Sequence, residues 1–167
     1  MSNNDNIEER TYTLRWTFDE GQGGHAHIGV RIDSNYSPSN AHRVQSRCGG
    51  HGYQYSASAY VAVLKMAFEI LRHSPISSFS IEREGVQFPA MAPPCGSFDG
   101  EKKYAVNWYN ADHRLCSGSV TVTRNRNSSI YRYGTFAGGA ASPMIALYQA
   151  ACEVAGGAGT FFVTEAS

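Results

Sequence analysis

Basic and imidazole side chains recur at alternate positions in the first third of the chain. They are Arg15, then His25, His27 and Arg31, then Arg43 and Arg47. Alternate residues of a β-strand share one face, so we expect these side chains on a common surface. Guanidinium groups bind phosphate, and Tyr53 and Tyr55 could stack on a base. The pattern predicts an anion site for a nucleotide, a phosphorylated metabolite or a single strand of nucleic acid.

The corresponding positions later in the chain are neutral. They read Asn107, Ser117, Ser119 and Thr123. This difference between two similar segments favours a site in the first one. The alternative is a solvated face whose charges serve solubility, and the sequence leaves both interpretations open.

A glycine-rich segment, Cys48-Gly49-Gly50-His51-Gly52, precedes the first expected helix. Glycines let backbone N–H groups approach a ligand, and a helix N-terminus attracts anions. Gly50 and His51 are therefore candidate ligand-binding residues. A tight turn between a strand and a helix is the alternative, because Gly138-Gly139 occupies the same place in the second half.

Four residues offer the nitrogen and sulfur ligands that zinc prefers. His25 and His27 share a strand face, and Cys48 and His51 could complete a tetrahedral set. This requires the end of the third strand to lie near the start of the second. A zinc-dependent hydrolase is the function that such a site would imply.

The sequence favours binding over catalysis. It contains no G-x-S-x-G, H-E-x-x-H, Walker or G-x-G-x-x-G pattern. The leading prediction is a non-catalytic protein that sequesters or senses an anionic ligand. An interaction or inhibitor module that acts on a protein partner is the alternative.

The elements that must position these residues occur twice. Y-T-L-R-W at 12–16 matches Y-A-V-N-W at 104–108, so both tryptophans hold equivalent places. The segment 58–63 likewise matches 142–147. Repetition of this kind indicates one supersecondary unit used twice.

Hydrophobic periodicity predicts the same element order in each half. Strands are expected near 12–18, 25–33 and 43–48 before a helix at 56–72, and near 104–109, 117–124 and 130–136 before a helix at 143–155. A short strand or hairpin near 79–88 and a terminal strand at 160–164 could be added. Ser142 followed by Pro143 is a favourable helix start.

These elements predict an α+β fold of internally duplicated β-β-β-α units. Each antiparallel sheet is expected to be covered by one helix, with pseudo-twofold symmetry. The expected divisions are a disordered N-terminus at 1–10, a first unit at 11–72, a crossover linker at 73–102, a second unit at 103–157, and a tail or short strand at 158–167.

Two families of β-β-β-α units share this pattern. The stretches 25–33, 49–52 and 58–71 resemble the second strand, loop and last helix of a double-stranded-RNA-binding domain, although 54–58 lacks the lysines of its phosphate clamp. The stretches 104–106, 119–123 and 142–151 are similar to the second unit of the isopropylmalate synthase regulatory domain, which implies effector binding between units. Accessory proteins of phages and mobile elements often have this size and style.

Composition bounds these interpretations. The chain of 167 residues has 14 basic and 14 acidic residues, so any anion site must be local. The polar start carries no signal peptide, no stretch is long enough to cross a membrane, and the four cysteines form no C-x-x-C pair. We therefore expect a cytoplasmic protein with free thiols. Exposed sheet edges favour a homodimer or larger homo-oligomer.

Overall fold

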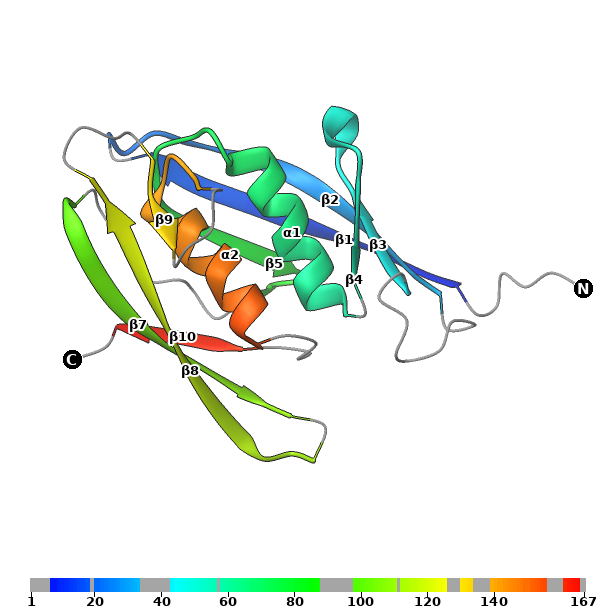
Figure 1. Cartoon of the computed structure of the whole chain (residues 1–167). Coiled ribbons are helices and arrows are strands. Elements are labelled where there is room, and N and C mark those ends of the chain that lie inside the picture. Colours follow the sequence, from blue (N-terminus) through cyan, green and yellow to red (C-terminus); the bar gives the residue numbers. More distant parts are fainter. Residues whose placement is uncertain are drawn as a thin grey trace, which may run out of the picture.

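The computed structural model describes residues 7–18, 20–33, 43–56, 58–87, 98–110, 112–125, 130–133, 139–155 and 161–165. Within these residues the chain forms an α+β fold (Figure 1). The strands are β1 (Ile7–Phe18), β2 (Gly23–Asp33), β3 (Val44–Arg47), β4 (Tyr53–Ser56), β5 (Ile76–Arg83), β6 (Val86–Gln87), β7 (Gly100–Tyr109), β8 (Leu115–Arg124), β9 (Arg132–Tyr133) and β10 (Phe162–Glu165). The helices are α1 (Ala59–Leu71) and α2 (Pro143–Ala155), and the short 3-10 helix η2 spans Gly49–His51.

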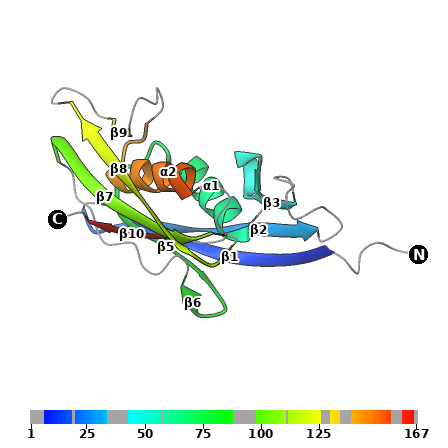
Figure 2. The ribbon, with the colours of Figure 1, turned by 60° about the horizontal axis from the view of Figure 1, so that its bottom comes forward.

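The strands form two antiparallel sheets. The six-stranded sheet has the order β4-β3-β2-β1-β5-β6, and the four-stranded sheet has the order β10-β7-β8-β9. Helix α1 packs on β2, β3 and β4, whereas α2 packs on β7, β8 and β9 and also contacts β5. The helices contact each other and form a layer against the sheets, as Figure 2 shows. The two sheets therefore share one core.

Alternation along the strands decides which face each sheet buries. Tyr12 and Leu14 of β1 are buried together with Ile28 and Val30 of β2, and the residues between them face outward. The same alternation buries Tyr104 and Val106 of β7 with Val120 and Val122 of β8. Burial of this apolar face is the main source of stability for such a sheet.

Serine caps begin both helices, and the second cap also ties its helix to β5. The Ser58 Oγ accepts a hydrogen bond from Val61 N at 3.2 Å. The Ser142 Oγ accepts from Met144 N at 3.2 Å and donates to Ile76 O of β5 at 2.6 Å. The helix start predicted at Ser142-Pro143 is therefore confirmed.

The first sheet is larger than the β-β-β-α pattern predicts. Gly49 and Gly52 adopt positive φ angles of 49° and 76°, which reverse the chain so that β4 pairs with β3 before the helix begins. β5 then joins the free side of β1, and β10 joins β7 in the same way. The stretch expected as a crossover thus contributes β5 and β6 to the first sheet, at the place where a short hairpin was expected.

The two sheets correspond in strand order and register. Tyr12 pairs with Ile28 as Tyr104 pairs with Val120, and β5 flanks β1 as β10 flanks β7. Each tryptophan lies against a glycine of the neighbouring strand, Trp16 beside Gly24 and Trp108 beside Gly118. Such a correspondence agrees with a duplicated unit. A common origin of the two halves and a twofold superposition remain predictions.

Within the described ranges, neither helix has the length and hydrophobicity that a membrane crossing requires.

Candidate functional site

The outer face of the six-stranded sheet, opposite the helices, carries the polar residues that alternate with the core. Backbone pairing orders them in rows across the strands. One row runs Thr11, Gly29, Arg47, Tyr53, and the next runs Glu9, Arg31, Gln45, Tyr55. Directly paired side chains on one face lie close enough to touch, so four strands contribute to a single surface.

A hollow of about 320 Å³ lies over these two rows. Its lining residues are Glu9, Arg10, Thr11, Gly29, Val30, Arg31, Gln45, Arg47 and Tyr53. Gly29 creates the space, because a strand residue with a side chain would project into it. A Cβ built on Gly29 would meet the Arg47 side chain, with Nε at 3.4 Å and Cγ at 3.5 Å.

Arg31 and Arg47 supply unpaired positive charge to the hollow. Both side chains are exposed, and neither forms an ion pair with any residue that the structure describes. Glu9 lies directly opposite Arg31 in the register, yet the two are not within ion-pair distance. A guanidinium without a carboxylate partner keeps its donors available for an anion.

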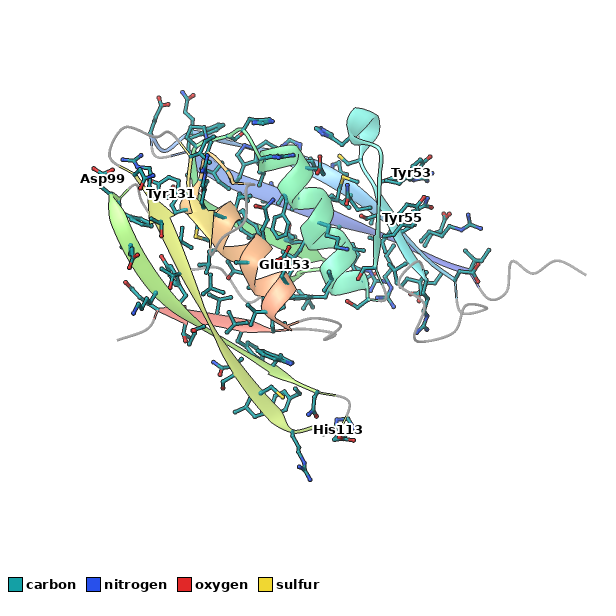
Figure 3. All side chains as sticks on the ribbon, in the orientation of Figure 1. Tyr53, Tyr55, Asp99, His113, Tyr131 and Glu153 are labelled. Atoms are coloured by element: carbon teal, nitrogen blue, oxygen red, sulfur yellow. The ribbon has the colours of Figure 1, made fainter. Side chains whose placement is uncertain are left out.

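Two tyrosines of the edge strand β4 flank the hollow. Tyr53 is 55% exposed and Tyr55 is 40% exposed, values that are high for aromatic rings. Gln45 Nε2 donates to the Tyr55 hydroxyl at 3.1 Å, which holds that ring above the sheet. Figure 3 shows both tyrosines together beside β4, well separated from Asp99, which precedes β7, and from His113 in the turn between β7 and β8.

Arg10 lines the hollow but is already engaged. Its guanidinium donates to Glu8 at 2.6 and 3.0 Å, and these hydrogen bonds raise the pKa of Arg10 and lower the pKa of Glu8. The Arg10 side chain has the parity of the inward-facing Tyr12 and Leu14 and donates to the Tyr12 hydroxyl, so only the Arg10 backbone borders the hollow. Arg31 and Arg47 therefore carry the available charge.

The other basic residues expected at the site lie on the same face at a distance from the hollow. Arg15 and His25 pair across β1 and β2, and Arg15 Nε lies 3.4 Å from Glu82. His27 accepts or donates a hydrogen bond with Thr13 Oγ1 at 3.4 Å. Arg43 precedes β3, where its carbonyl accepts a hydrogen bond from Asp33 N at 3.0 Å, and its Nε is buried without a hydrogen-bond partner.

The glycine-rich segment differs from its predicted place. Gly50 and His51 lie in the 3-10 turn between β3 and β4, not at the N-terminus of a helix, because β4 intervenes before α1. Both are exposed and neither lines the hollow. The segment is a strand-to-strand turn, so the helix dipole cannot act through it.

The residues suggested as zinc ligands do not converge. No three His, Cys, Asp or Glu side chains among the described residues are grouped to hold a metal, and His25, His27, Cys48 and His51 all belong to those residues. β3 pairs with the later half of β2, from Gly29 to Ile32, so its end does not reach His25. Cys48 also packs against the core, opposite the outer face, where burial raises its thiol pKa.

Sequence reasoning missed several residues of the hollow, above all Gly29, Thr11 and Glu9. The sequence did contain a signal for Gly29, which lies in the middle of an expected strand between the outward residues His27 and Arg31. A glycine inside a strand often marks a close approach by another group. Thr11 and Glu9 follow only from the register between β1 and β2.

No protein-family model, curated protein or solved structure matches this chain.

Proposed function

We propose that the protein is a non-catalytic binding protein that sequesters or senses an anionic ligand, a nucleotide or a nucleic-acid segment, in the hollow over Gly29. The observation that supports the proposal most directly is that Arg31 and Arg47 lie close together on neighbouring strands and form no ion pair with any described residue. Exposed tyrosine rings lie beside them. Phosphate would bind the guanidinium groups, and a base would stack on Tyr53.

The fold provides a rigid platform for this role. The two arginines project from neighbouring strands at adjoining rows, because Gly29 pairs with Arg47 and Arg31 pairs with Gln45. Their backbones are fixed by the sheet, so less conformational entropy is lost on binding than for groups on a loop.

Calorimetric titration with ATP and with an eight-nucleotide oligo-dT tests the proposal. The double charge reversal Arg31→Glu, Arg47→Glu should abolish binding, because charge-assisted hydrogen bonds contribute about 1.5–3 kcal/mol each. Lys103→Glu with Arg132→Glu is the matched control, since both residues are exposed on the other sheet and the change in net charge is equal. Absence of binding to either anion, or an unchanged affinity in the double reversal, would contradict the proposal.

An interaction module is the second candidate, and it has its own support on the four-stranded sheet. Tyr109 and Leu115 pair at the end of the β7–β8 hairpin and are 54% and 61% exposed. Phe162 of β10, 50% exposed, pairs with Asn107 next to them on the same face. An exposed apolar patch of this kind is typical of a protein contact.

Cytoplasmic location and assembly into a homodimer or larger oligomer are further proposals. The described cysteines Cys48, Cys116 and Cys152 are free thiols, which suits a reducing compartment. Size-exclusion chromatography with light scattering would test the assembly. A monomer at the highest concentration reached in the titrations would contradict it.

A further inference from the structure

The basic residues of the outer face form a line along β2 that is longer than the hollow. Outward side chains of this strand occur at every second residue, and neighbouring strands add a cation at most rows. We name the set Arg15, His25, His27, Arg47, Arg31 and Arg43 the basic track. It runs from the row of Arg15 and His25, through His27, Arg47 and Arg31, to Arg43 beside Asp33.

The length of the basic track favours a polyanion. Along β2 the hollow involves residues 29–31, whereas the track extends from His25 to Asp33. At 3.3–3.4 Å per strand residue this is about 27 Å. Successive rows are about 6.7 Å apart, which is of the same order as the step between phosphates of an extended strand. A mononucleotide in the hollow would leave both ends of the track without a ligand.

The charges of the track are accessible along most of its length. Arg15 is held by Glu82, but the side chains are 59% and 35% exposed, so water screens the pair and an incoming phosphate can compete for it. His25 and His27 are exposed, with ring centroids 5.8 Å apart. At the other end Arg43 is only partly exposed, and its Nε is buried, so it is the least accessible member of the track.

The aromatic flank favours unpaired bases over a duplex. Tyr53 and Tyr55 stand beside the track on β4, where splayed bases can stack on them. Bases inside a duplex are stacked on each other and cannot reach these rings.

We propose that the anionic ligand is a single strand of nucleic acid that lies along β2, with its phosphates on the basic track and its bases toward Tyr53 and Tyr55. This inference rests on the proposed function and specifies its ligand. The two rows that line the hollow form the centre of the contact. The row that contains His27 and the row that contains Arg15 and His25 extend the contact along the sheet.

Fluorescence anisotropy with labelled oligo-dT and oligo-U of two to twelve nucleotides tests the inference, with ATP and a duplex of equal length as competitors. Affinity should rise with length to a plateau, and an octamer should bind at least about tenfold tighter than ATP, the gain expected from one added charge-assisted contact. The slope of log K against log salt should steepen by about 0.7 for each added phosphate contact.

Arg15→Gln with His25→Gln should lower the ratio of octamer to ATP affinity, whereas Lys103→Gln on the other sheet should not.

The outcomes separate the two proposals. Equal affinity for ATP and the octamer, with no effect of Arg15→Gln and His25→Gln, would overturn the inference that the ligand is a single strand of nucleic acid. The hollow would then remain a nucleotide site. A duplex that competes as well as the single strand would also overturn the inference. Binding to neither ATP nor any oligonucleotide would overturn both proposals.

Discussion

At four outward positions the six-stranded sheet has Arg15, His25, His27 and Arg31, where the four-stranded sheet has Asn107, Ser117, Ser119 and Thr123. The strands that carry them pair in the same register. The backbone therefore presents the same positions twice, and the side chains at these four positions are basic on one sheet and neutral on the other. A ligand site on such a scaffold depends on the outward residues alone, because the inward residues are committed to the core.

The same comparison explains why the hollow lies on the first sheet. Gly29 corresponds to Thr121, whose side chain occupies the equivalent space on β8. A single missing side chain in the middle of β2 thus gives the first sheet a depression that the second sheet lacks at this position.

Gly29→Thr is the most direct test of this comparison, because it copies the second sheet into the first. The threonine side chain would fill the hollow beside Arg47 and lower the affinity for ATP or an oligonucleotide at least about tenfold, the equivalent of one charge-assisted contact. The Cβ contacts of 3.4 and 3.5 Å are ordinary, and threonine suits a strand, so the melting temperature should not fall. Calorimetric titration and thermal unfolding of the same sample give both quantities, and undiminished binding would place the ligand elsewhere.

Ser142→Ala tests the inner side, where each helix begins at a serine cap. It removes a cap and leaves the buried Ile76 carbonyl without its 2.6 Å partner, so the free energy of unfolding should fall by about 2–4 kcal/mol. Urea denaturation monitored by tryptophan fluorescence measures the change. A loss below about 1 kcal/mol would show that the bond to β5 adds nothing to the cap.

Ser58→Ala is the matched change in the first unit and should cost less. Ser58 caps α1 through Val61 N, and it is only half-buried, so its replacement should lower the free energy of unfolding by about 1 kcal/mol. Equal losses for Ser58→Ala and Ser142→Ala in urea denaturation would contradict the difference expected between the two units.

High pH should weaken the second unit more than the first. Burial raises the pKa of Tyr148 and of Cys152 to about 12, whereas α1 has Leu64 and Phe68 at the corresponding positions. Both pKa values are higher in the folded than in the unfolded chain, so this stability is complete below about pH 9 and is lost as the pH rises toward 12.

For Tyr148 alone the expected loss between pH 9 and pH 11 is about 1 kcal/mol. Tyr148→Phe, which keeps the ring against Phe79 and Phe161, should flatten the pH dependence of urea denaturation over this range. An identical pH profile for the variant and the unchanged protein would show that another group is responsible.

Much of the fold could be predicted from local sequence. Period-two alternation located β1, β2, β7 and β8, and the Ser142-Pro143 start located α2 at the bounds observed. Strand β4 was missed because Tyr53–Ser56 is short and follows glycines, so its only distinguishing feature is its pairing with β3. The candidate zinc ligands do not converge for a related reason, since strand periodicity does not show which part of β2 pairs with β3.

The sequence by itself determined which residues are buried and which face outward, because side-chain alternation and helical spacing are local properties of the backbone. It therefore placed Arg31, Arg47 and Tyr53 on exposed surfaces. Only the tertiary structure decided that these three residues meet over Gly29. Register between strands depends on contacts between distant parts of the chain, and a shift of two residues would keep every face and separate these side chains by about 7 Å.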